Sequence, residues 1–134
     1  MDNYALDANI IIHYLNKQPN VFRKLREAIS VGSDIVIPKM ADYELRRGFR
    51  AKPNPKKEAA YEILLEDCPV SEMDAISWEQ ATQVYADLYQ KRFTVGEMDM
   101  LIAAFCLANN LTLVTNNTSD FVNIDNLNME DWTK

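Results

Sequence analysis

The order of apolar segments along the chain constrains its fold more than any other feature. Between short apolar runs lie segments whose apolar residues recur at helical spacing. Because strand–helix–strand connections are right-handed and leave parallel strands in one sheet, this alternation predicts an α/β domain. We expect three layers, with a central, mostly parallel sheet flanked by helices. The strand candidates are residues 4–6, 35–37, 68–70 and 111–114.

Helix boundaries are marked by proline, glycine and capping patterns. Pro19 opens the second expected helix, and Gly32 follows its end. The capping-box spacings at 77–80 and 94–97 predict two further helix starts. In the long helix beginning at Ser77, one apolar face is expected to hold Trp78, Ala81, Val84, Tyr85 and Leu88. The other expected helices are 8–15, about 39–49, a stretch through 60–64, and 98–108.

Length and composition indicate one ordinary globular domain spanning residues 1–134. Hydrophobic residues make up 48% of the chain and charged residues 25%, and no apolar run approaches the roughly 18 residues of a membrane span. Two cysteines without an export signal predict reduced thiols and a cytoplasmic protein. The single histidine, His13, excludes a site that needs several imidazoles, and we interpret it as a packing or surface residue.

The charge of the chain is unevenly distributed. The formal net charge is −6, yet residues 46–57 hold six basic residues and no acidic one. An acidic body with one basic segment is compatible with an anionic partner bound at that segment, and equally with a solvated loop.

Four carboxylates from distant parts of the chain are predicted to meet at one edge of the sheet. Asp7 follows the first strand, Asp120 follows the last, Glu44 lies in the helix after the second strand, and Asp99 lies early in the helix before the last strand. Ligands of parallel sheets bind beyond the carboxyl ends of the strands. Each acid also has a structural alternative: Asp7 as a helix cap, Glu44 paired with Arg47, Asp99 at a helix N-terminus and Asp120 in an Asx-turn.

Converging carboxylates repel one another in a poorly solvated cleft unless a cation is bound. An oxygen-only set without His or Cys selects Mg²⁺ or Mn²⁺. Such an ion would orient a water, lower its pKa and stabilise the leaving oxygen of a phosphodiester. The pattern therefore favours metal-dependent phosphodiester hydrolysis without a nucleophilic side chain.

Four stretches of the sequence resemble the PIN domain and, within it, the VapC-type toxins of bacterial type II toxin–antitoxin systems. These stretches are 6–10 (Leu-Asp-Ala-Asn-Ile), 43–48 (Tyr-Glu-Leu-Arg-Arg-Gly), 99–105 (Asp-Met-Leu-Ile-Ala-Ala-Phe) and 113–121 (Leu-Val-Thr-Asn-Asn-Thr-Ser-Asp-Phe). Their order and spacing match the family across nearly the whole chain.

The resemblance implies an Mg²⁺-dependent endoribonuclease that a cognate antitoxin holds in check, and it favours a homodimer. It implies Asp7, Glu44, Asp99 and Asp120 as the catalytic and metal-binding residues, with Asp7 and Asp99 the surest ligands. Thr115 and Asn117 match polar positions that orient carboxylates. Where the family usually has a hydroxyl residue, this chain has Ala8, and we expect Asn9 to compensate.

Several residues near these stretches are open to two interpretations. Arg46 and Arg50, one helical turn apart, are candidates for holding RNA phosphates beside the acidic cleft. Glu97 is a fifth carboxylate close to Asp99, but its position in the capping-box pattern explains it adequately. Phe49 is either a base-stacking residue or part of the core, and the 10–12 run with Tyr14 is either a dimer surface or buried.

Two other functions compete with the nuclease. An aspartyl-phosphate phosphohydrolase would use Asp7 but normally has a second Asp two residues later, where this chain has Asn9. A non-catalytic PIN-fold module that binds RNA or protein would leave clustered carboxylates without a use. The intact set of four acids therefore favours the nuclease.

Overall fold

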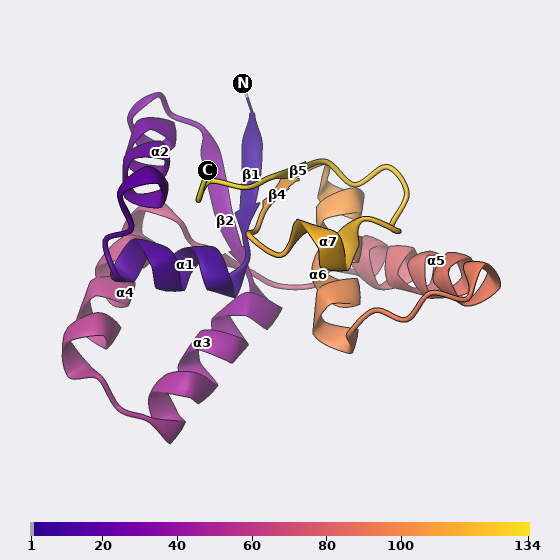
Figure 1. The fold of residues 1–134 in the computed structure, drawn as a ribbon, viewed down its shortest axis with the longest axis horizontal. Coiled ribbons are helices and arrows are strands. Elements are labelled where there is room, and N and C mark those ends of the chain that lie inside the picture. Colours follow the sequence, from indigo (N-terminus) through magenta and orange to yellow (C-terminus); the bar gives the residue numbers. More distant parts are fainter. Residues whose placement is uncertain (1) are drawn as a thin grey trace.

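The computed structural model of the chain describes residues 2–134, and its centre is one five-stranded parallel sheet (Figure 1). The strands lie in the order β3-β2-β1-β4-β5, and each neighbouring pair is parallel. The predicted α/β class is thereby confirmed. Their bounds are β1 (Asn3–Leu6), β2 (Asp34–Pro38), β3 (Val70–Ser71), β4 (Thr112–Val114) and β5 (Met129–Glu130).

Helices cover both faces of the sheet. In Figure 1, the first four helices lie on one side of the strands and α5 and α6 lie on the other. Within residues 2–134, none of the helices is long and apolar enough to cross a membrane. The bounds are α1 (Ala8–Leu15), α2 (Pro19–Ser30), α3 (Lys39–Ala51), α4 (Pro55–Asp67), α5 (Ala75–Lys91), α6 (Glu97–Asn109) and α7 (Thr118–Phe121).

The core forms around the central strand. Ala5 and Leu6 of β1 have no exposed surface, because a parallel strand in the middle of a sheet is covered on both faces. Phe49 packs against this core and against the Tyr61 ring, as its core interpretation predicts. Both cysteines are buried free thiols, in agreement with the prediction of reduced cysteines.

Both capping-box predictions are wrong in their details. Helix α5 begins at Ala75, because Asp74 caps it with a hydrogen bond from the Ser77 amide at 2.8 Å. Ser77 is buried inside the helix, where its hydroxyl accepts a bond from Asn109. Helix α6 begins at Glu97 after Gly96, with no side-chain cap.

The apolar face of α5 also differs from the expected one. Its buried positions are Ser77, Ala81, Val84 and Leu88, whereas Trp78 and Tyr85 are 53% and 55% exposed. The helix therefore packs on α6 through small and aliphatic side chains and leaves its aromatic residues in solvent. Strand β5 was not expected, since two residues carry no alternating pattern.

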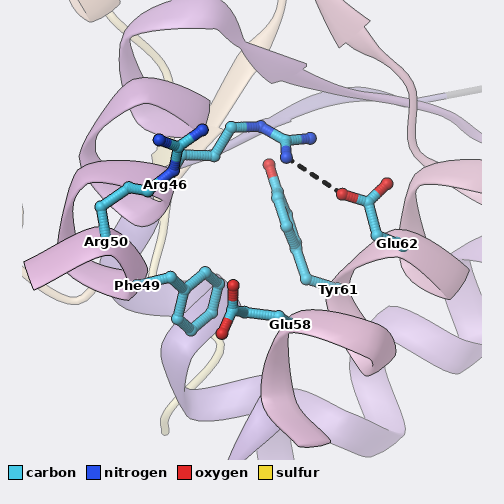
Figure 2. Close-up of a pocket in the computed structure, with 6 residues that line it drawn as sticks. All are labelled: Arg46, Phe49, Arg50, Glu58, Tyr61 and Glu62. Atoms are coloured by element: carbon cyan, nitrogen blue, oxygen red, sulfur yellow. Dashed lines mark hydrogen bonds and ion pairs between the residues drawn. The ribbon is translucent and has the colours of Figure 1, made fainter. Parts of the chain in front are cut away.

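A buried carboxylate joins α3 to α4. Asp42 is 1% exposed and accepts hydrogen bonds from Tyr61 Oη at 2.7 Å and Arg46 Nε at 2.9 Å, while Lys39 approaches at 3.3 Å. Arg46 also reaches Glu62 at 3.0 Å and lies over the Tyr61 ring (Figure 2). Burial alone would raise the pKa of Asp42, but the Tyr61 hydroxyl and the Arg46 charge hold it below its usual value.

The contact of Arg46 with RNA stays a prediction, since its side chain is 46% exposed but already paired within the protein. Its guanidinium is committed to two carboxylates and an aromatic ring. These contacts fix α4 against α3, the helix that contains Glu44. We name the set the Asp42 cluster; its members are Lys39, Asp42, Arg46, Tyr61 and Glu62.

Tyr61→Phe is expected to destabilise the protein by about 1.5–3 kcal/mol, since it removes a hydrogen bond to a buried charge. The measurement is the free energy of unfolding in urea. The matched control is Tyr85→Phe, whose hydroxyl lies on an exposed ring, and it should change that free energy by less than about 0.5 kcal/mol. Equal stability of both variants would contradict the role of the Asp42 cluster.

Candidate functional site

The first residue of the site is Asp7, at the carboxyl end of the central strand. Its backbone amide bonds to the Val114 carbonyl of β4 at 2.9 Å, so the two strand ends are held together. Asp7 Oδ1 accepts from the Ala8 amide at 2.8 Å and thus caps α1. Asp7 Oδ2 accepts from Thr115 Oγ1 at 2.9 Å and from Asn9 Nδ2 at 3.1 Å. The cap interpretation is correct, and it occupies only one of the two oxygens.

A network of polar side chains ties the β4–α7 loop to this carboxylate. Asn9 Oδ1 accepts from the Asn116 amide at 3.1 Å, and Thr115 Oγ1 accepts from the Asn117 amide at 3.1 Å. His13 Nε2 lies 3.3 Å from the Asn116 side-chain amide. Asn117 takes part through its backbone, and within residues 2–134 its side chain forms no hydrogen bond to the acids. Asn116 was not predicted as a site residue, although its main chain contacts Asn9 and its side chain contacts His13 of α1.

Asp99 is close enough to Asp7, Asp120 and Glu44 for electrostatic influence between them. Burial raises the pKa of Asp99, and the negative charges of Asp7 and Asp120 raise it further. Burial also raises the pKa of Glu44, again with added rises from Asp7 and Asp99, while Arg47 opposes them. The pKa of Asp7 is raised mainly by burial, which outweighs its three hydrogen bonds, with a smaller rise from Asp120. Asp7 and Asp99 are thus each coupled to Asp120, and Glu44 is coupled to Asp7 and Asp99.

The carboxylates of Asp7, Glu44, Asp99 and Asp120 are farther apart than the ligands of a bound metal ion. Across residues 2–134, no group of three or more His, Cys, Asp or Glu side chains is close enough to hold a metal ion. Mutual repulsion keeps carboxylates apart unless a cation lies between them. The donor set, which contains only oxygen, fits Mg²⁺ or Mn²⁺. Glu97 is exposed on the first turn of α6 whereas Asp99 is half-buried.

The basic residues beside the acids differ in their partners. Arg47 lies 3.9 Å from Glu44, so the predicted pair forms only a long ion pair. Arg50, the second candidate for RNA binding, forms no salt bridge or side-chain hydrogen bond within the described part of the chain.

An apolar groove leads away from the acidic region between α1, α3 and α4. Its volume is about 320 Å³, and Glu44 lies in its wall. Ile12, Leu15 and Leu45 provide apolar surface. Lys52 and Lys57 add positive charge to the same lining.

Comparisons with known proteins agree on one family. The PIN domain family model matches residues 4–127. The chain is 31% identical over 132 residues to "Ribonuclease VapC2" of Rickettsia felis, covering 98% of each chain. It is 29% identical to "tRNA(fMet)-specific endonuclease VapC" of Shigella flexneri, covering 99% of this chain and 100% of the relative.

Solved structures give the same result. The Rickettsia felis VapBC2 complex bound to a promoter DNA fragment superposes with a TM-score of 0.86 at 29% identity, covering 95% of this chain and 96% of the other. The DNA-bound VapBC complex of Salmonella typhimurium superposes with a TM-score of 0.88 at 26% identity, covering 98% and 99%.

Asp99→Asn is expected to raise the thermal midpoint of the metal-free protein, because it removes one charge from a mutually repelling set. Millimolar Mn²⁺ should raise the midpoint of the wild type and have little effect on this variant. Glu97→Gln, two residues away and exposed, is the control and should respond to Mn²⁺ as the wild type does. A wild-type midpoint that Mn²⁺ leaves unchanged would contradict the metal site.

Proposed function

This chain belongs to the PIN-domain family and within it to the VapC group. We propose that it is an RNA-cleaving hydrolase that acts as the toxin of a toxin–antitoxin pair. The observation that carries the proposal is the position of Asp7 at the joined ends of β1 and β4, where its charge raises the pKa of both Glu44 and Asp99. Relatives of nearly equal length are named ribonucleases, and they cover almost the whole chain.

We propose that the four acids bind Mg²⁺ or Mn²⁺, with Asp7 and Asp99 as the principal ligands and Glu44 and Asp120 beside them. When bound, the ion supplies positive charge that polarises a phosphodiester and favours attack by water. Thr115 and Asn9 hold Asp7 in one orientation through their bonds to Oδ2.

Ala8 occupies the position at which the family usually has a hydroxyl residue next to the first aspartate. The Ala8 amide still donates to Asp7 Oδ1, but its side chain has nothing to donate. Asn9 Nδ2 contacts both Asp7 and Thr115, at 3.1 and 3.4 Å. We propose that Asn9 takes over the orienting role of the absent hydroxyl.

The partner we propose for the apolar groove is the cognate antitoxin. The solved relatives are complexes of a VapC chain with VapB. An apolar segment of an antitoxin would fit Ile12, Leu15 and Leu45, and a basic side chain next to it would reach the carboxylates beyond Glu44. Buried free thiols suit a reducing compartment, which supports a cytoplasmic location.

We also propose that the chain forms a homodimer, but not through the surface that the sequence suggested. Ile10 and Ile11 are fully buried and Tyr14 stacks on Phe22, so of the 10–12 run only Ile12, at 48% exposed, faces outward. A better surface is the α5 stripe, which we define as Trp78, Thr82, Tyr85 and Tyr89. Its three aromatic rings are 53–73% exposed, and the stripe contains no charge.

Asp7→Asn and Asp99→Asn are each expected to abolish RNA cleavage in vitro and growth inhibition in cells, with circular dichroism unchanged. A loss of at least about 100-fold in rate is expected for removal of a principal metal ligand. Glu97→Gln should cleave RNA at the wild-type rate. Full Mg²⁺-dependent cleavage by the Asp7→Asn/Asp99→Asn double variant would refute the assignment.

Tyr85→Glu/Tyr89→Glu is expected to turn a dimeric protein into a monomer in sedimentation equilibrium, because it places charges in the centre of the α5 stripe. The control is Ile63→Glu on α4, which is 65% exposed and lies outside the stripe, and it should stay dimeric. Dimers that persist in the double variant would move the interface elsewhere.

A further inference from the structure

One exposed face of α3 combines an aromatic ring with two arginines. Tyr43, Arg47 and Arg50 are spaced i, i+4 and i+7, which places them on the same side of the helix. Tyr43 is 48% exposed, and the Arg47 guanidinium lies 5.1 Å from the centre of its ring. We name these three residues the α3 strip. Arg46 is not part of it, because the Asp42 cluster holds that side chain against α4.

The α3 strip begins at the acidic site. Arg47 lies three residues after Glu44 and four after Tyr43, so its side chain is a neighbour of both on the helix surface. Its guanidinium is 3.9 Å from the Glu44 carboxylate and simultaneously stacks on Tyr43. A chain molecule bound along the strip would therefore pass directly into the region of the four acids.

The charges of the strip suit a polyanion. The protein carries a net charge of −6, but residues 46–57 contain six basic residues and no acid, so the part of α3 that follows Glu44 is positively charged. Arg50 has no ion-pair partner within residues 2–134, although it lines a pocket that also contains Glu58 and Glu62 of α4 (Figure 2). Arginines of this kind bind phosphates, and an exposed tyrosine ring stacks on an unpaired base.

We propose that the α3 strip binds the single-stranded RNA substrate, with Tyr43 stacking on one base and Arg47 and Arg50 contacting phosphates of the strand that enters the acidic site. This inference deepens the proposed nuclease function and depends on it for the identity of the ligand. Because single-stranded RNA is recognised mainly by stacking and backbone contacts, Tyr43 becomes a residue that selects an unpaired nucleotide beside the cleaved bond.

Binding is measured by fluorescence anisotropy of a labelled single-stranded oligoribonucleotide in EDTA, where no cleavage occurs. Tyr43→Ala is expected to weaken binding about 5- to 100-fold, the effect of losing one stacked base, and Tyr43→Phe should restore it. Arg50→Gln should lower the slope of log K against log salt concentration by about 0.7, as the loss of one phosphate contact to a single strand does. Tyr43→Ala should leave that slope unchanged.

Matched controls come from α2, whose Phe22 and Arg23 are also exposed and adjacent. Phe22→Ala and Arg23→Gln should bind the oligoribonucleotide as the wild type does. In Mg²⁺, Tyr43→Ala should raise KM and leave kcat largely intact, which a structural defect at Glu44 would not do.

The outcomes separate this inference from the proposed function. If the protein cleaves RNA and Tyr43→Ala and Arg50→Gln bind like the wild type, the nuclease stands and the α3 strip is refuted. If no divalent ion supports cleavage but both substitutions weaken binding as described, the strip stands and the nuclease is refuted. If Tyr43→Phe binds as weakly as Tyr43→Ala, the stacking role is refuted.

Discussion

The hydrogen bonds around the Asp7 carboxylate are the interaction on which the rest of the site depends. One oxygen caps α1, and the other receives Thr115 and Asn9, so a single side chain joins β1, α1 and the loop after β4. Burial works against a charge at this position, and the three donors only partly offset it. Asp7 is therefore held firmly in place but remains short of positive charge, which is the condition that makes binding of a divalent ion favourable.

Rules that act over the whole fold made much of this site predictable. Parallel strands align their carboxyl ends, so Asp7 and Asp120 were expected together although 113 positions separate them. The role of Arg46 was not predictable, because its partners Tyr61 and Glu62 lie in the next helix and no local pattern marks Asp42 as buried. The start of α5 was missed since Asp74 competes with Ser77 for the same cap.

Helix α3 has different neighbours on three of its sides. Leu45 and Phe49 face the core and the apolar groove, Asp42 and Arg46 hold α4, and Tyr43 with Arg47 faces solvent. Glu44 lies where these sides meet the acidic region. Loss of the Asp42 contacts on the α4 side of α3 is therefore expected to change the setting of Glu44 through the helix backbone.

The packing of α5 on α6 has a mechanical consequence. The two helices contact each other more extensively than any other pair of elements, and the residues buried between them from α5 are small or aliphatic. Asp99 lies in the first turn of α6, directly after the connection that leaves α5. The packed pair therefore joins the exposed aromatic rings of α5 to the first turn of α6, where Asp99 lies. Substitutions of the buried α5 residues are therefore expected to shift the start of α6, and Asp99 with it.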